Sequence, residues 1–316
     1  MRSRPSIPRS RPSPRPNRRF WFLLSLSLFA LSSFHLLGSL LHRANSLGRR
    51  CLPADDSASP SPPSNIAIVT FSAESSAGGI AGARNRRMMK PRSFEGLMET
   101  VIDNKRGYAE RGGYRFVDSR GLVDPSRPAS WSKILAVRSV LDDHDWVFWN
   151  DADILVTNPN ITLERILRSA IGDADFDNSP DLIVTEDATG FNAGVFFVRR
   201  SEWSVRFLDT WWNQTSFIRE SGSTKSGDND ALKHLIGGLS EEERRVHVRV
   251  PSMQCAFNSY PLSATWKTAY RMIASPLTIW RGVFSYGDFM VHLAGIDKKT
   301  EWAVRILKEI DDGRSS

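Results

Sequence analysis

Cysteine is scarce in this chain, with Cys51 and Cys255 the two in 316 residues. Small domains that depend on disulfides need several closely spaced cysteines, so two residues this far apart exclude a disulfide framework. A bridge between them stays open, and two free thiols are the simpler interpretation. The sequence also lacks an internal repeat, which excludes a repeat array.

Acidic residues are absent from residues 1–19, which hold seven arginines. The formal net charge of the whole chain is +7, so this tail accounts for the excess and the remainder is close to neutral. A nucleic-acid-binding protein carries its basic residues as a patch on a folded domain. We therefore expect no nucleic-acid partner.

Charged residues are absent from residues 20–41, which are rich in Leu and Phe. At about 1.5 Å per residue, a helix of this length spans a bilayer core of about 30 Å. Arginines are more numerous before this run than after it, so the positive-inside rule predicts a cytosolic tail at 1–19, a transmembrane signal-anchor at 20–41 and a lumenal remainder. A cleaved signal peptide is the alternative, but the run is long for one and no A-x-A cleavage site follows.

Residues 42–64 are rich in Pro, Ser, Ala and Asp and end in the run SPSPPS. This composition is typical of a flexible stem, so we expect a linker at 42–64 and a folded lumenal domain at 65–316. Glycosylation sequons at Asn160 and Asn213 fit exposure of this domain to the lumen.

Apolar runs with strand character alternate with helical apolar spacing in the folded domain. Strands are predicted at 66–71, 114–117, 146–149, 181–185, within 190–199, and at 246–250 and 289–293. Helices are predicted at 94–110, 130–141 with Ser130 as its cap, 161–171, 201–212, 228–236 and 300–310. This alternation predicts an α/β domain with a mostly parallel sheet, to which the closely spaced later strands add an antiparallel part.

Two carboxylates follow the buried run at 146–149: Asp151 and Asp153, separated by Ala152. Side chains two apart in an extended backbone point to the same side, so the pair should converge at the carboxyl end of a strand, where open α/β sheets bind ligands. Two like charges this close favour a cation between them, and hard oxygen donors suit Mg²⁺ or Mn²⁺. A strand-end turn without a metal is the other interpretation, because Asp is common in turns.

Six segments, in order, resemble the motifs of glycosyltransferase family 34. They are NKRGYAERGGY (104–114), WSK (131–133), WVFWNDAD (146–153), NAGVFFVRRSEWS (192–204), GDNDAL (227–232) and VHLAG (291–295). Gly112 stands where the family usually has His. The segments span most of the folded domain, so the resemblance is more specific than the Asp-x-Asp pair alone.

The resemblance implies a single GT-A domain, a Rossmann-like nucleotide-sugar-binding fold, preceded by the transmembrane helix. It also implies a type II membrane protein of the Golgi that transfers galactose, xylose or mannose from a nucleotide sugar to a glycan acceptor, with retention of configuration. The acceptor would be a polysaccharide or a glycoprotein glycan, and other glycosyltransferases are candidate partners. A catalytically inactive, membrane-anchored glycan-binding or scaffold subunit is the alternative from another class.

The family motifs assign a metal and donor site to this chain. Asp151, Asp153 and His292 would bind Mn²⁺, or Mg²⁺, which bridges the donor diphosphate. Gly295 would let backbone N–H groups approach a phosphate. Lys133 would face the donor phosphates, although a helix lysine that reaches solvent is the other interpretation.

The same motifs assign the sugar-binding and catalytic positions. Asn192 would bind the sugar or stabilise its developing positive charge. Asp187, which precedes Asn192 in the chain, is a further candidate to contact sugar hydroxyls, and a solvated loop acid is the other interpretation. Asp228 is the candidate carboxylate near the anomeric carbon, either as nucleophile or as a group that orients the donor, with Asn229 where the family has Gln. The alternative for Asp228 is an acid that stabilises a helix N-terminus.

One basic position is harder to assign from the resemblance. Plant members tend to place a basic residue shortly after the His292 motif, where this chain has Asp297 followed by Lys298 and Lys299. The sequence leaves open which lysine faces phosphate.

Overall fold

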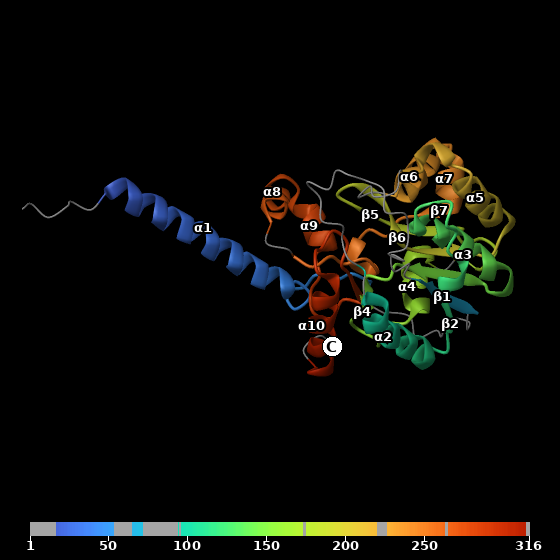
Figure 1. Cartoon of the computed structure of the whole chain (residues 1–316), viewed down its shortest axis with the longest axis horizontal. Coiled ribbons are helices and arrows are strands. Elements are labelled where there is room, and N and C mark those ends of the chain that lie inside the picture. The colour runs from blue at the N-terminus through green and yellow to red at the C-terminus, as the bar shows by residue number, and fades with distance from the viewer. Residues whose placement is uncertain are drawn as a thin grey trace, which may run out of the picture. The chain divides into compact units, whose positions relative to one another are not determined.

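The structure is a computed structural model that describes residues 17–53, 65–71, 94, 96–172, 175–219, 226–262 and 265–313 (Figure 1). Most of the predicted tail, residues 1–16, and the second half of the predicted linker, residues 54–64, lie outside the described residues. The chain divides into two compact units, Met1–Leu40 and Leu41–Ser316.

The first unit contains helix α1 (Arg18–His42), whose last two residues belong to the second unit. Among the described residues, α1 is the one helix long and apolar enough to cross a membrane. Its large side chains, such as Phe29 and Leu31, are exposed. By length and composition α1 fits the span predicted at 20–41.

The second unit is built on a six-stranded sheet with the strand order β2-β1-β3-β6-β5-β7. The strands are β1 (Ile66–Thr70), β2 (Arg115–Asp118), β3 (Trp146–Asn150), β5 (Leu182–Asp187), β6 (Gly190–Arg199) and β7 (Val248–Arg249). β1 pairs in parallel with β2 and β3, and β5 with β7, whereas β6 is antiparallel to β3 and β5. The α/β fold with a mixed sheet that the sequence predicts is confirmed.

Both faces of the central strands are buried, which explains why β1 and β3 are continuously apolar. Side chains alternate between the faces, so Val147 and Trp149 join one core cluster while Trp146 and Phe148 join the other. The first cluster is covered by α3 (Ser132–Val140), α5 (Glu202–Trp212) and α6 (Asp228–Gly238). The second is covered by α2 (Leu97–Gly112) and α4 (Leu163–Ile171).

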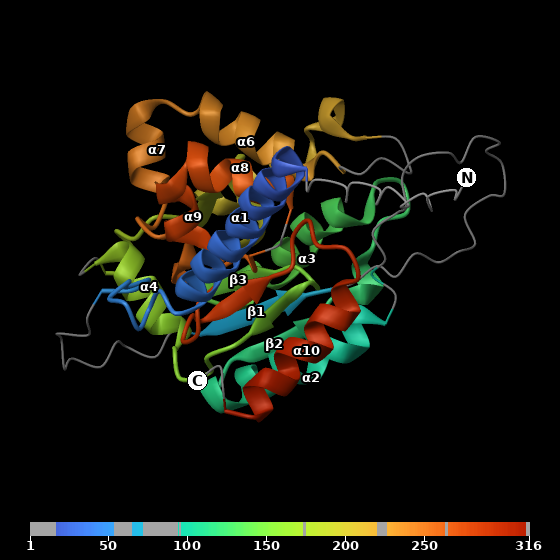
Figure 2. The same cartoon turned by 90° about the vertical axis from the view of Figure 1, so that its left-hand side faces the viewer.

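A second sheet of two strands lies beside the first. β4 (Ile154–Val156) pairs antiparallel with β8 (Met290–His292). Helix α10 (Lys299–Asp311) packs beside α2 in a third core cluster that also contains Leu155 and Val291 (Figure 2). This sheet matters for the site because it joins the Asp-x-Asp turn to the last strand.

Two local predictions are wrong. The strand predicted at 246–250 is only Val248–Arg249, because a capping box between Ser240 and Glu243 starts helix α7 (Glu241–His247), which continues into the expected strand. Ser130 does not cap the next helix: α3 begins at Ser132, and Ser130 Oγ instead donates a hydrogen bond to Asp228 Oδ1 at 3.0 Å.

Helices α8 (Trp266–Ala274) and α9 (Pro276–Gly282) form a hairpin between β7 and β8. The sequence analysis placed no element there. Thr265 caps α8 through a hydrogen bond from Thr268 N, and proline begins α9.

The beginning of the predicted linker is folded rather than flexible. Arg49 is buried in an ion pair with Asp288 at 2.7 Å, and its Nη1 donates to Val283 O. Cys51 and Cys255 form a disulfide, with their Cα atoms 5.3 Å apart, so the interpretation of two free thiols is wrong. The folded unit therefore starts before residue 65, because this segment is attached to it both covalently and by a buried charge.

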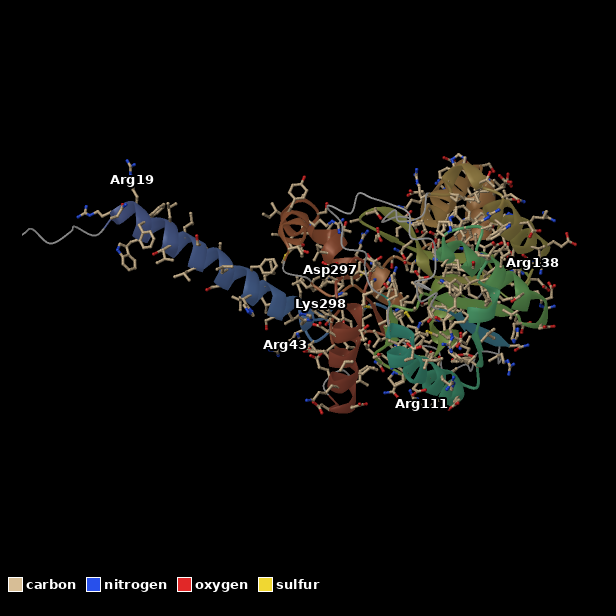
Figure 3. The ribbon with its side chains drawn as sticks, viewed as in Figure 1. Arg19, Arg43, Arg111, Arg138, Asp297 and Lys298 are labelled. Atoms are coloured by element: carbon tan, nitrogen blue, oxygen red, sulfur yellow. A yellow bond between two sulfur atoms is a disulfide. The ribbon has the colours of Figure 1, made fainter. Side chains whose placement is uncertain are left out.

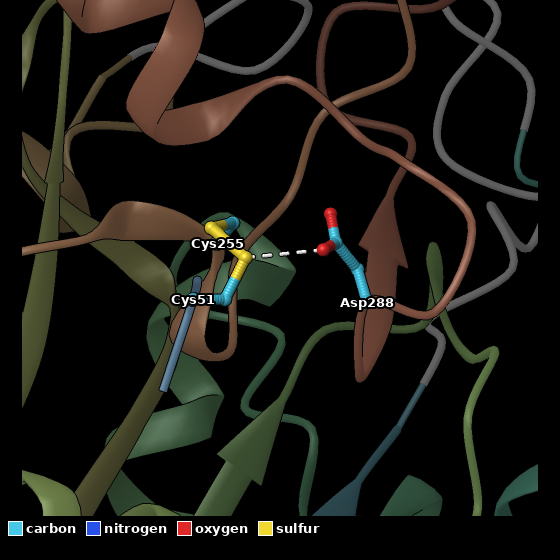
Figure 4. A group of neighbouring side chains, drawn as sticks. All are labelled: Cys51, Cys255 and Asp288. Carbon is cyan, nitrogen blue, oxygen red and sulfur yellow. Dashed lines mark hydrogen bonds between the residues drawn. A yellow bond between two sulfur atoms is a disulfide. The ribbon is translucent and has the colours of Figure 1, made fainter. Parts of the chain in front are cut away.

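Figure 4 shows the disulfide beside Asp288, with Cys51 Sγ 3.1 Å from Asp288 Oδ1. The two sulfurs and this carboxylate lie close enough to suggest a metal site. Both sulfurs are in the disulfide, however, so neither is a thiolate that could bind a metal. We interpret the group as structural.

Candidate active site

Asp151, Asp153 and His292 converge where β3, β4 and β8 meet. Each offers one ligand atom, and these atoms lie within 4.8 Å of one another. The two aspartates belong to a turn, closed by a hydrogen bond from Ile154 N to Asp151 O at 3.2 Å. The extended backbone expected for the pair is therefore wrong, since the turn brings the carboxylates together.

Strand pairing brings His292 to the two aspartates. His292 lies opposite Ile154 in the β4–β8 pair, and Leu293 N donates to Asp153 O at 2.8 Å. The ring Nε2 is 3.4 Å from Asp153 Oδ1. A residue far along the chain thus joins the turn through main-chain hydrogen bonds.

Asn258 holds the other side of the His292 ring. Its Oδ1 lies 2.9 Å from Nδ1, and its Nδ2 donates to Thr185 Oγ1 at 2.7 Å. With its amide donor used by Thr185, Oδ1 is placed to accept from Nδ1–H, and in the tautomer that binds a metal the lone pair then lies on Nε2, on the side of Asp153. A Cβ atom at Gly194 would come 2.4 Å from His292 Cε1, so glycine leaves the room that the ring needs.

Lys133 links the first aspartate of the turn to Asp228. Its Nζ lies 3.1 Å from Asp151 Oδ1 and 3.0 Å from Asp228 Oδ2, and donates to Ala193 O at 2.9 Å. Burial by itself would lower the pKa of Lys133, but the two carboxylates outweigh it and raise that pKa. The ammonium therefore stays charged inside the protein and does not extend to solvent.

Asp228 is buried at the start of α6 and fully engaged. Besides Lys133, it accepts hydrogen bonds from the hydroxyl groups of Ser130 and Ser226. Burial opposes ionisation, yet Lys133 and these hydroxyls hold the pKa of Asp228 below its usual value. Asn229 beside it accepts a hydrogen bond from Ala193 N at 2.6 Å, so it supports the part of β6 that carries Asn192.

Lys299 and Lys298 occupy different environments. Lys299 is buried, ion-paired with Asp153 Oδ2, and donates to Leu293 O at 2.9 Å. Burial would raise the pKa of Asp153, but His292 and Lys299 outweigh it and lower that pKa. Lys298 is exposed and pairs with Glu301 at 2.9 Å (Figure 3). Of the two lysines that the sequence left open, Lys299 is the one at the site.

A further buried lysine, Lys105, supports the main chain of the turn that carries Asp151 and Asp153. Its Nζ donates to Asp151 O at 2.7 Å and to Thr70 Oγ1 at 3.0 Å. Burial lowers the pKa of Lys105 to about 7. It lies in the first family-like segment, 104–114, but the resemblance did not indicate this contact with the site.

Asn192, Asp187 and Tyr260 form a hydrogen-bonded group next to the metal candidates. Asn192 Nδ2 donates to Asp187 Oδ2 at 3.0 Å and to the Tyr260 hydroxyl at 2.8 Å, and that hydroxyl donates to Asp187 Oδ2 at 2.7 Å. The Tyr260 ring lies 5.4 Å from the His292 ring. The structure thus brings the predicted Asn192 and Asp187 together, and adds Tyr260, which no sequence motif indicates.

Gly295 follows β8 on the surface, with φ 75°. This left-handed conformation favours glycine. It forms the turn in which Ile296 N donates to Leu293 O at 3.2 Å. The turn lies between His292 and Lys299 in the sequence.

The predicted ligands fit a hard divalent cation. Two carboxylates and a neutral imidazole form a suitable donor set, and Asp153 Oδ1 faces His292 Nε2 while Lys299 engages Oδ2. Asp151 is held by a hydrogen bond from Trp149 Nε1 at 2.8 Å, and about a third of its side chain, 31%, is exposed. The candidate site is therefore open to a ligand from the side of Asp151.

The sequence model of the galactosyl transferase GMA12/MNN10 family, glycosyltransferase family 34, matches residues 80–174 and 172–302. These segments contain every candidate site residue and cover more than half of the chain. The chain belongs to this family. The family resemblance drawn from the six motifs is confirmed.

Two relatives of the family come from yeasts. The chain is 25% identical over 226 residues to MNN10 of Saccharomyces cerevisiae, a probable α-1,6-mannosyltransferase, with 62% of this chain and 55% of that protein covered. It is 29% identical over 231 residues to a Schizosaccharomyces pombe protein named as an α-1,2-galactosyltransferase, with 63% and 56% covered. The chain thus spans about half the length of these curated relatives.

Similar solved structures include the galactosyltransferase LgtC in complex with donor and acceptor sugar analogues. The identity is 16%, the TM-score is 0.44, and 78% of this chain and 95% of that chain are covered. A glycosyltransferase involved in glycosylation of the major capsid of PBCV-1 has 13% identity and a TM-score of 0.45, with 77% and 99% covered.

Proposed function

We propose that this family member is a retaining glycosyltransferase that moves galactose, xylose or mannose from a nucleotide sugar to a glycan acceptor and depends on Mn²⁺ or Mg²⁺. The observation that carries the proposal is the convergence of Asp151, Asp153 and His292, with ligand atoms within 4.8 Å of one another. Family membership and the intact donor set favour an enzyme over a scaffold, because a subunit that only binds glycans needs no such ligands.

Asp151, Asp153 and His292 would hold the metal, which when bound would neutralise the donor diphosphate and stabilise the departing nucleotide. Lys299 would act beside them, since an ammonium in contact with Asp153 is close enough to reach a diphosphate at the same site. Asn258 fixes the imidazole so that Nε2 faces the ligand position. These residues therefore prepare the leaving-group side of the reaction.

Lys133, Asp228 and Asn192 would act on the sugar side. Lys133 keeps Asp228 ionised and fixes its position relative to Asp151. An anionic Asp228 would stabilise positive charge that develops at the anomeric carbon, in the role either of nucleophile or of orienting group. Asn192, fixed by Asp187 and Tyr260, would hydrogen-bond sugar hydroxyls.

We also propose that the protein is a type II membrane protein of the Golgi, with residues 1–19 in the cytosol, residues 20–41 spanning the membrane and the catalytic unit in the lumen. The length and composition of α1 support the span. The Cys51–Cys255 disulfide supports the lumenal side, because disulfides persist in oxidising compartments of the secretory pathway.

The test is a donor screen on the full-length protein in detergent micelles with Mn²⁺. UDP-galactose, UDP-xylose and GDP-mannose are offered, and the anomeric configuration of the product is read by NMR. We expect transfer from one donor with retention, loss of activity on removing the metal with a chelator, and restoration by Mn²⁺. Transfer with inversion would overturn the retaining mechanism.

Asp153→Asn tests the metal assignment, with Asp297→Asn as the matched control. Asp297 is an exposed acid two residues before Lys299 and lies outside the group of candidate ligands. We expect Asp153→Asn to lose transfer and Asp297→Asn to retain it. A protein that binds Mn²⁺ but transfers none of the three sugars would support the scaffold interpretation instead.

A further inference from the structure

Helices α8 and α9 present large apolar side chains at the surface of the second unit. Tyr270, Ile273 and Leu277 have exposed fractions of 62%, 85% and 67%. Ile273 and Leu277 flank the turn that joins the two helices. We call these three residues the α8–α9 tip. Neighbouring exposed apolar residues of this size mark a contact surface rather than an ordinary solvated one.

The chain around the tip is basic. No Asp or Glu occurs from Arg244 to Gly287. Arg271 in α8 and Arg281 in α9 are both exposed. Apolar side chains accompanied by Arg, without acids, are typical of helices that lie in a membrane interface, with the basic groups against anionic headgroups.

The segment that follows α1 is bound to the same part of the fold. Tyr286 N and Ser285 Oγ donate to His42 O at 3.0 and 2.9 Å. Arg49 Nη1 donates to Trp280 O, in α9, at 3.2 Å. With the buried Arg49 ion pair and the disulfide, these contacts fix the segment against the end of α9. Figures 1 and 2 show α8 and α9 on the side of the second unit where this segment lies.

This attachment limits how far the tip can be from a membrane. If residues 20–41 span the bilayer, His42 lies at its lumenal surface. Helix α9 has seven residues, about 10 Å in length, so Leu277 lies within about 10 Å of the end of α9 that contacts Arg49. The interfacial layer on each side of the hydrocarbon core is itself about 5–8 Å thick. The tip therefore lies near the segment at which the chain would leave the membrane.

We propose that the α8–α9 tip inserts into the lumenal leaflet and forms a second membrane contact of the catalytic unit. Ile273 and Leu277 enter the boundary between headgroups and acyl chains, while Arg271 and Arg281 meet the phosphate groups of the lipids. The inference rests on the proposed membrane anchor and is independent of the sugar chemistry. It also gives the catalytic unit a defined orientation to the membrane, because the tip and the segment at His42 are two attachment points.

The experiment uses full-length protein reconstituted in lipid nanodiscs that contain an anionic lipid. A ketone-bearing unnatural amino acid carries a single nitroxide at position 273 or 277, so the native disulfide stays intact. Collision of the nitroxide with oxygen, which concentrates in the membrane, is compared with collision with a water-soluble nickel complex. Val246, an aliphatic residue of α7 that is 50% exposed, is the matched control, and Leu31 of α1 reports on the anchor.

We expect labels at 273, 277 and 31 to collide preferentially with oxygen, and the label at 246 with the nickel complex. A water-exposed label at 273 and 277, with a buried label at 31, would overturn the inference and leave the anchor intact. A water-exposed label at 31 would overturn the anchor and with it this inference, without bearing on sugar transfer. Spectral broadening by a second nitroxide would assign the tip to contact with a second copy and would also overturn it.

Discussion

Replacement of Asn258 by alanine should weaken Mn²⁺ binding although Asn258 is not itself a ligand. Its Oδ1 accepts from His292 Nδ1–H at 2.9 Å, and its side chain is fully buried. Without this acceptor, the ring loses the contact that keeps Nδ1 protonated and Nε2 free for the metal. The loss of such a supporting hydrogen bond typically costs about 10–100-fold in metal affinity.

The same change should also affect stability, so the two effects have to be separated. Removal of Asn258 leaves Nδ1–H without its acceptor and Thr185 Oγ1 without its donor, at a cost of about 1–3 kcal/mol for each buried group that stays unsatisfied. Metal affinity is therefore measured by EPR of free Mn²⁺ at a temperature where circular dichroism shows the variant folded.

Asn158→Ala is the matched control. Asn158 Nδ2 donates to Gly287 O at 3.0 Å, but the residue has no contact with His292 among the described hydrogen bonds. We expect a modest loss of stability and unchanged Mn²⁺ affinity in this variant. Asn258→Asp, which restores an acceptor, should recover part of the affinity. If folded Asn258→Ala binds Mn²⁺ as tightly as the unaltered protein, Asn258 does not position His292.

Three further changes test other parts of the structure. Gly194→Ala places a methyl group against the His292 ring and should weaken Mn²⁺ binding about 10-fold or more with the fold retained. Gly237→Ala is the control, because its added methyl group meets nothing within 4 Å, and it should leave binding unchanged. Equal binding by both variants in the EPR titration would contradict the packing argument. Replacing both Cys51 and Cys255 by Ser removes a disulfide whose cysteines are 204 residues apart, and should lower the free energy of unfolding in urea by about 4–5 kcal/mol. An unchanged unfolding midpoint would mean that the Arg49–Asp288 ion pair alone holds the segment after α1. Arg49→Met leaves Asp288 buried without its ion-pair partner and should lower the free energy of unfolding by about 3–5 kcal/mol. Arg138→Met, which removes an exposed ion pair at α3, should lower it by less than about 1 kcal/mol. Similar losses for the two variants would refute the role of the buried Arg49 ion pair.

The central strands and the convergence of the three candidate ligands were predictable because their signals are local or belong to a motif. The continuous apolar run at 146–149 can be buried on both faces only in the centre of a sheet, and it ends at Asp151 and Asp153. Sequence distance hides the third member, since His292 reaches the turn through the β4–β8 pair. It was found because its motif carries a histidine, and not because periodicity indicated a contact.

The site residues that the sequence did not indicate lie outside the periodic apolar patterns that predict helices and strands. Asn258 and Tyr260 lie between β7 and α8, where no strand or helix pattern indicated which way side chains face. The prediction of a flexible stem at 42–64 is wrong for the first part of that range, for a related reason. Its Ser- and Pro-rich composition is that of a linker, but one arginine and one cysteine are enough to attach its first part when their partners are Asp288 and Cys255. Such pairings depend on the tertiary fold, which composition does not encode.

The attachment of this segment and the metal candidate use the same two stretches of chain. Cys255 lies three residues before Asn258, and Asp288 lies four residues before His292. Between them, Ser259 Oγ donates to Asp288 Oδ2 at 2.8 Å and its carbonyl accepts from His292 N at 2.8 Å. The contacts that attach residues 42–51 to the folded unit are therefore continuous with those that hold the strand and loop on either side of the imidazole.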